Sequence, residues 1–154
     1  MTGPAERLAA LGLTLPPVAA PVASYVPAVR TGAFVYTSGQ LPTVDGKLPA
    51  VGKVGGAVSA SDAAGMARTC ALNALAAAAS AAGGLEAIRR IVKVTGFVAS
   101  APGFGGQPQV INGASELLIE VFGENGKHAR SAVGVAELPL DAPVEVELIA
   151  EVGD

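Results

Sequence analysis

The sequence has little charge and few aromatic side chains. Charged residues occupy 15% of the 154 positions, aromatic residues occupy 4%, and tryptophan is absent. Hydrophobic residues, by contrast, reach 51%. Disordered chains combine low hydrophobicity with high charge, so this composition excludes a disordered protein. The length fits one folded domain with little room for a second. We therefore divide the chain into an N-terminal extension with a short helix, residues 1–22, and a single domain, residues 23–154.

The chain also lacks an apolar run that could cross a membrane as a helix. Such a helix needs about 20 apolar residues without breakers. The uncharged run over residues 8–29 contains four prolines, and the alanine-rich run over residues 69–85 ends in two glycines. The start of the chain, with Glu6 beside Arg7 and a short apolar stretch, does not match a secretory signal. We therefore expect no membrane association and a cytoplasmic location.

Side chains for metal and redox chemistry are scarce, since the sequence has one cysteine and one histidine. A single cysteine excludes an internal disulfide and a cysteine zinc cluster, and a single histidine excludes a multi-histidine metal site. No phosphate-binding loop, dinucleotide fingerprint or GxSxG elbow is present. We therefore expect neither a metal nor a cofactor. We place Cys70 in the core, within an alanine-rich helix, and His128 in a solvated polar turn.

The charge balance disfavours nucleic acid as a partner. Ten Lys and Arg residues against 13 Asp and Glu residues give a net charge of −3. Proteins that bind nucleic acid usually carry a basic stripe. Here the basic residues cluster only briefly, at residues 89–93 and 127–130.

Hydrophobic periodicity and turn residues predict alternating strands and helices. A short helix is predicted over residues 6–13, before a proline pair that ends it. The remaining predicted elements are strands over residues 23–30 and 33–38, a helix over 62–82, a strand over 90–99, a helix over 109–122, and strands over 130–137 and 144–152. This order indicates an α+β fold in which two main helices pack on one face of a single mixed β-sheet.

The other face of the predicted sheet has no helices to cover it. Apolar residues nevertheless point to both sides of several strands: Val29, Phe34, Tyr36, Val92, Val94, Val133 and Val135. An exposed apolar sheet face is typical of a subunit interface. We therefore expect a homo-oligomer.

Read one at a time, the candidate site residues leave two interpretations open. The guanidinium of Arg130 is a planar fork that suits a carboxylate ligand, but it also suits a surface ion pair with a glutamate. Glu145 and Glu147 could act as a general base or could lie on a solvated strand face. Tyr25 and Ser38 are either functional polar groups of the first hairpin or residues of a strand edge.

Two segments together resemble a known family. Residues 129–139, ARSAVGVAELP, are followed by VEVELIA at residues 144–150, and the hairpin over residues 25–42 contains SGQLP. These segments resemble the signatures of the Rid (reactive intermediate deaminase) family, also called YjgF-like or L-PSP endoribonuclease-like. The resemblance covers residues 24–152, and the extra length is similar to that of a divergent branch of about 150 residues.

The resemblance implies a chorismate-mutase-like fold, a homotrimer, and ligand sites in the clefts between subunits. It implies hydrolysis of enamine and imine carboxylates such as 2-aminoacrylate to 2-keto acids and ammonia, without a cofactor. Arg130 matches the arginine that grips the substrate carboxylate, and Glu145 matches the acidic residue that positions or activates water, with Glu147 as a substitute. The residues that match the pocket lining are Tyr25, Ser38 and, in the second main helix, Asn112.

The sequence departs from the family pattern at two further positions of the expected substrate pocket. Ala132 stands where many members have a cysteine, and Ser115 stands where compact members have an aromatic residue. Both changes alter the pocket, so the substrate need not be 2-aminoacrylate itself. Two other functions stay open. A non-catalytic, small-carboxylate-binding or sensing trimer would need Arg130 but not Glu145, and an endoribonuclease is disfavoured by the acidic charge balance.

Overall fold

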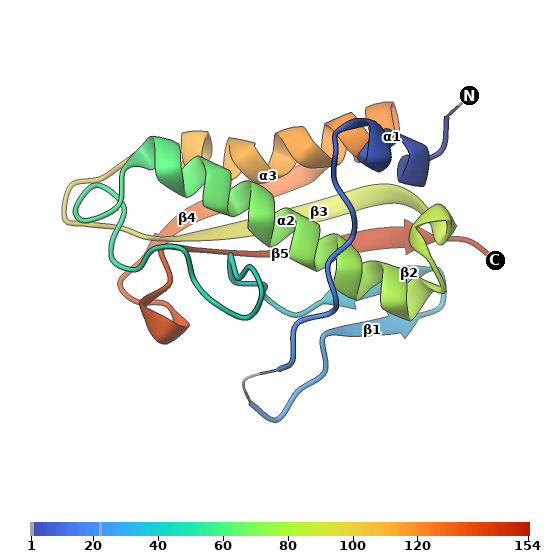
Figure 1. Ribbon diagram of the computed structural model, residues 1–154, viewed down its shortest axis with the longest axis horizontal. Coiled ribbons are helices and arrows are strands. Elements are labelled where there is room, and N and C mark those ends of the chain that lie inside the picture. The colour runs from blue at the N-terminus through green and yellow to red at the C-terminus, as the bar shows by residue number, and fades with distance from the viewer. Residues whose placement is uncertain (1, 22) are drawn as a thin grey trace.

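The protein, described here over residues 2–21 and 23–154 of a computed structural model, forms one mixed sheet with helices on one side (Figure 1). The strands are β1 (Ala28–Thr31), β2 (Phe34–Thr37), β3 (Ile88–Ala99), β4 (Ala129–Val135) and β5 (Val144–Val152). The α-helices are α1 (Pro4–Ala10), α2 (Ala60–Ala82) and α3 (Gln107–Phe122). Short 3₁₀ helices span Leu85–Ala87, Gly123–Gly126 and Pro139–Asp141. The predicted α+β class is therefore confirmed.

The strand order across the sheet is β1-β2-β5-β3-β4. The β3–β4 pair is parallel, and the other neighbouring pairs are antiparallel. The parallel pair requires a crossover, which α3 supplies on the helix-covered face. This connection places the N-terminal half of α3 over β4, and the first candidate group of site residues lies there.

The two main helices pack closely because their contact residues are small. Ser59 caps α2 by accepting a hydrogen bond from the backbone N–H of Asp62 at 3.0 Å, and Gly83 ends the helix at a φ of 92°. Where α2 meets α3, a Cβ atom at Gly113 would overlap the backbone carbonyl of Ala64. The buried side of α2 is mostly alanine and includes Cys70, which is fully buried as predicted.

The sheet has one covered and one open face. In β5, alternate residues from Val144 to Val152 are buried, while Glu145, Glu147 and Ile149 point to the opposite side and are only partly buried. Figure 1 shows α2 and α3 together on one side of the sheet. The open side carries large apolar residues that are 40–52% exposed: Val29, Phe34, Tyr36 and Val133. The prediction of an uncovered apolar face therefore agrees with the structure.

The N-terminal segment differs from the prediction. The first strand begins at Ala28 instead of residue 23, because Pro27 has no N–H to donate and uses its carbonyl to accept from the Ser38 N–H at 2.8 Å. The first helix covers Pro4–Ala10, and Leu8 is 3% exposed against the core. After α1, the chain crosses the outer side of α2 before reaching β1 (Figure 1).

No helix within residues 2–21 and 23–154 is long and apolar enough to cross a membrane.

Candidate functional site

Arg130 lies near the start of β4 and pairs with Val94 of β3. Since Val94 is fully buried under the helices, Arg130 also projects from the helix-covered side of the sheet, toward α3. Its Nη1 donates to Asn112 Oδ1 at 2.8 Å and to Ser115 Oγ at 3.2 Å, and its Nη2 donates to the Pro108 carbonyl at 3.3 Å. All three acceptors are neutral. Over the described part of the chain, no carboxylate pairs with Arg130, and Nε–H and one Nη2–H have no acceptor.

His128 supports this arrangement from behind Ser115. Its Nδ1 is 2.6 Å from the Gly126 carbonyl, so Nδ1 carries the proton of the neutral ring and Nε2 accepts from the Ser115 hydroxyl at 2.8 Å. The Ser115 oxygen is then oriented to accept from Arg130. Burial lowers the pKa of His128, as does the charge of Arg130, although the Gly126 hydrogen bond opposes both. The prediction of a solvated His128 is therefore wrong, because the turn folds its ring against α3 as a half-buried group.

Ala132 follows two residues later on the same side of β4 and pairs with Gly96. Ala132 is partly buried and packs against the margin of the core. Gly96 has no room for a side chain, since a Cβ atom there would overlap Ile111 of α3. We call the set Asn112, Ser115, His128, Arg130 and Ala132 the arginine cluster.

Glu145 is the centre of a second group at the start of β5. It pairs with Phe97 and points to the open side of the sheet. Its carboxylate rests on Gly39, where a Cβ atom would overlap Oε1. Burial raises the pKa of Glu145, and the negative charge of Glu147 raises it further. Burial alone raises the pKa of Glu147. A raised carboxyl pKa suits a group that exchanges protons with water and substrate near neutral pH.

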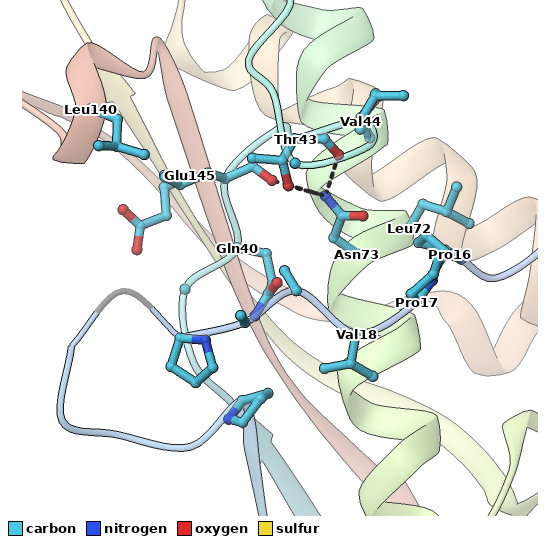
Figure 2. A pocket seen from close by; sticks show the side chains of 18 of the residues that line it. Pro16, Pro17, Val18, Gln40, Thr43, Val44, Leu72, Asn73, Leu140 and Glu145 are labelled. Atoms are coloured by element: carbon cyan, nitrogen blue, oxygen red, sulfur yellow. Dashed lines mark hydrogen bonds between the residues drawn. The ribbon is translucent and has the colours of Figure 1, made fainter.

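Ser38 directly precedes Gly39, and Tyr25 lines the same cavity as Glu145. The Ser38 hydroxyl donates to the Val26 carbonyl at 2.6 Å, which ties the segment before β1 to the end of β2. Tyr25 is 43% exposed and lines, with Gly39 and Glu145, a cavity of about 610 Å³. Figure 2 shows this cavity, with Glu145 labelled. We call Tyr25, Ser38 and Glu145 the glutamate cluster.

The two clusters do not meet within one chain. Across the sheet, Arg130 of β4 pairs with Val94 of β3, and Val94 pairs with Leu148 of β5. Leu148 lies three residues after Glu145 on the same strand. With strands about 4.8 Å apart and a rise of about 3.4 Å per residue, the Cα atoms of Arg130 and Glu145 are about 14 Å apart. Their side chains also leave opposite faces of the sheet. A small molecule therefore cannot touch both side chains within one chain.

The sequence analysis did not identify two polar residues that lie at the two clusters. Gln40 is 6% exposed and lies beside Glu145 in the cavity wall, and His128 orients Ser115. Gln40 belongs to the SGQLP segment, so its position was recognisable as part of a motif. For His128 the sequence carried no such signal, because its partner lies 13 residues away on α3. Among the residues that the structure describes, no three His, Cys, Asp or Glu side chains are grouped to hold a metal ion.

Comparison with known proteins gives a consistent result. The family described as "YjgF/chorismate mutase-like, putative endoribonuclease" matches residues 5–152. Protein TCP17 of Trypanosoma cruzi is 42% identical over 151 residues, covering 97% of this chain and 94% of that protein. The crystal structure of Atu1372 from Agrobacterium tumefaciens is 48% identical with a TM-score of 0.90, over 97% of this chain and 92% of that one.

A more distant solved structure carries a bound ligand. The structure of E. coli TdcF with bound serine is 29% identical to this chain, with a TM-score of 0.61 over 90% of this chain and 94% of that one. The match of the family over nearly the whole length, together with relatives above 40% identity, decides the assignment. The chain belongs to the YjgF/chorismate mutase-like family.

Proposed function

We propose that this protein is a cofactor-free hydrolytic deaminase that converts small enamine and imine carboxylates to 2-keto acids and ammonia. The observation that carries the proposal is the state of Arg130. Its permanent positive charge is held by three neutral acceptors and paired with no carboxylate of the described chain, so it is prepared for an anionic ligand. Its Nε–H and remaining Nη2–H are the donors left for a substrate carboxylate. The bound serine in E. coli TdcF supports a small amino-acid-like ligand.

The separation of the two clusters supports a homotrimer with sites between subunits. Arg130 and Glu145 have complementary chemical roles but lie on opposite faces of one sheet. A neighbouring copy that docks on the open face can bring its arginine cluster to the glutamate cluster of the first. Burial of the exposed apolar residues Val29, Phe34 and Tyr36 would stabilise that association.

The chemistry follows from the charges of the two clusters. An enamine first tautomerises to the imine, gaining a proton on carbon and losing one from nitrogen. Glu145, with its raised pKa, removes a proton from water as the oxygen attacks the imine carbon, and the imine nitrogen gains a proton. The resulting carbinolamine loses ammonia when its nitrogen is protonated and its hydroxyl is deprotonated. The balance is one imine and one water to one keto acid and one ammonia. Arg130 contributes orientation and neutralises the substrate carboxylate.

The direct test measures keto-acid release from enamines produced by serine or threonine dehydratase, with and without the protein. We expect wild type to accelerate release, and Arg130→Ala to lower kcat/KM by about a thousandfold because an oriented charge-assisted contact is lost. Arg68→Ala is the matched control, since Arg68 forms a half-exposed ion pair with Glu120 on the helix surface. An Arg130→Ala variant as active as wild type would refute the carboxylate clamp.

A second function, non-catalytic binding or sensing of small carboxylates, is favoured by one observation. The arginine cluster is fully formed within one chain, while Ala132 in that cluster has no group for chemistry. The Glu145→Gln variant separates the two functions. If wild type binds 2-ketobutyrate but shows no turnover, and Glu145→Gln binds it equally well, the sensing function replaces the catalytic one.

Ribonuclease activity, which the family description names, has less support in this chain. The net charge is −3, and the half-buried His128 is engaged at both ring nitrogens.

A further inference from the structure

The cavity beside Glu145 is much larger than a small enamine requires. It extends from Glu145 to α2 and is closed on one side by residues 16–21, which we call the proline strap (Figure 2). Thr69, Leu72 and Asn73 of α2 form the opposite wall. Its volume of about 610 Å³ falls in the range of cavities that hold drug-sized molecules, roughly 300–1,000 Å³. A substrate with the single methylene of 2-aminoacrylate would leave most of it to water.

The walls of the cavity are mostly apolar and carry no cation. The proline strap supplies Pro16, Pro17 and Pro21, and further apolar surface comes from Val44 and Leu140, which are 54% and 65% exposed. No lysine, arginine or histidine lines the cavity in the part of the chain that the structure describes, whereas Glu145 and Asp45 do. An anionic side chain would therefore meet repulsion here.

Two buried amides add hydrogen-bond acceptors to these apolar walls. Asn73 and Gln40 are each 6% exposed. Asn73 Nδ2 donates to the carbonyls of Leu41 and Thr43, both at 3.0 Å, and Gln40 Nε2 donates to the Ser38 carbonyl at 3.3 Å. These bonds fix the amide groups, and no described residue donates to Asn73 Oδ1 or Gln40 Oε1. Both oxygens belong to residues that line the cavity, so a bound group with an N–H or O–H could satisfy them.

We propose that this cavity receives the substrate side chain, and that the preferred substrates are imino acids with a large, uncharged and mostly apolar side chain. The inference rests on the proposed deaminase function, because Glu145 would then act at the mouth of the cavity on the imine carbon. Each methylene that moves from water into an apolar site strengthens transition-state binding by about fourfold. Several extra carbon atoms therefore raise kcat/KM by more than tenfold.

The test compares imino acids made from alanine, leucine and phenylalanine by an amino-acid oxidase, with semicarbazide capturing the imine that the protein leaves. We expect kcat/KM to be at least about tenfold higher for the phenylalanine-derived imine than for the alanine-derived one. Ala20 is an exposed residue of the proline strap and lines the cavity, so the indole of Ala20→Trp would fill part of it. This variant should lower the ratio of kcat/KM between the phenylalanine-derived and alanine-derived imines about tenfold. Ala9→Trp, on the exposed side of α1 and outside the cavity, is the matched control and should keep the wild-type ratio.

Binding of the product keto acids separates failure of this inference from failure of the deaminase function. Calorimetry on the intact oligomer should show phenylpyruvate binding at least about tenfold tighter than pyruvate, with the difference reduced in Ala20→Trp. Equal kcat/KM for all three imines, or a ratio that Ala20→Trp leaves unchanged, overturns the side-chain pocket while the deaminase function stands. A different result would reject the deaminase function and keep the pocket. In that case no imine is hydrolysed, but phenylpyruvate binds more tightly than pyruvate and Ala20→Trp reduces the difference.

Discussion

The arginine cluster and the glutamate cluster are built in opposite ways. Arg130 is fixed by hydrogen bonds to Asn112, Ser115 and Pro108, so its position is complete within one chain. Glu145 rests against Gly39, and no described residue donates a hydrogen bond to its carboxylate. In the proposed function, the first group holds a charged ligand in a fixed orientation. The second keeps a half-buried acid with a raised pKa, which is suited to moving a proton.

The largest effect is expected when two inactive variants, one altered in each cluster, are combined in one oligomer. Arg130→Ala and Glu145→Gln are each expected to be inactive. In the proposed homotrimer, a mixed oligomer would contain some clefts with an intact Arg130 from one subunit and an intact Glu145 from another. Random mixing of equal amounts gives about a quarter of the clefts in that state, so activity should return to about a quarter of wild type. The measurement is keto-acid release after the two variants are unfolded and refolded together. No recovered activity would show that one chain supplies the whole site.

Gly39→Ala should disable the glutamate cluster alone. The new methyl group overlaps the Glu145 carboxylate and displaces it, so we expect kcat to fall by about ten- to a hundredfold. Affinity for a 2-keto acid, which the proposed function assigns to Arg130, should change much less. Gly105→Ala is the control, because nothing lies within 4 Å of an added Cβ atom there. Equal losses in kcat and in keto-acid affinity would contradict the division of roles between the clusters.

The pH dependence should report the glutamate cluster. If Glu145 acts as a base, activity requires its ionised form and falls as the pH decreases through its pKa, which burial and Glu147 hold above the ordinary carboxyl value. Glu147→Gln removes a neighbouring negative charge and so lowers the pKa of Glu145. The acid limb of the kcat profile should then move to lower pH by a fraction of a unit. A limb that stays in place would mean that Glu147 does not act on Glu145.

The smallest effect is expected for Ser115, which accepts a hydrogen bond from Arg130. Ser115→Ala removes one of three acceptors and leaves His128 Nε2 without its donor, so we expect KM to rise about fivefold with little change in kcat. Ser115→Thr keeps the hydroxyl and should restore most of the affinity. A fall in kcat with unchanged KM would place Ser115 in the chemical step instead of in the positioning of Arg130.

The fold was predictable because its signals are local. Alternation in β5 identified both the buried valines and the outward Glu145 and Glu147, and small residues followed by Gly83 defined α2. The motif segments also identified Arg130 and Glu145 as candidates. His128 and the start of β1 were predicted wrongly, since both depend on contacts with residues distant in sequence: Ser115 for the first and Ser38 for the second.

By itself, the sequence determined an α+β chain with low charge, an uncovered apolar strand surface and two segments bearing the polar residues of the candidate site. Only the tertiary structure decided that these residues form two groups on opposite faces of one sheet. Pairing register causes this, because it places Arg130 level with Leu148 instead of Glu145 and assigns each side chain to a face. The cavity between the proline strap and α2 likewise depends on how the N-terminal segment crosses that helix, which no local pattern encodes.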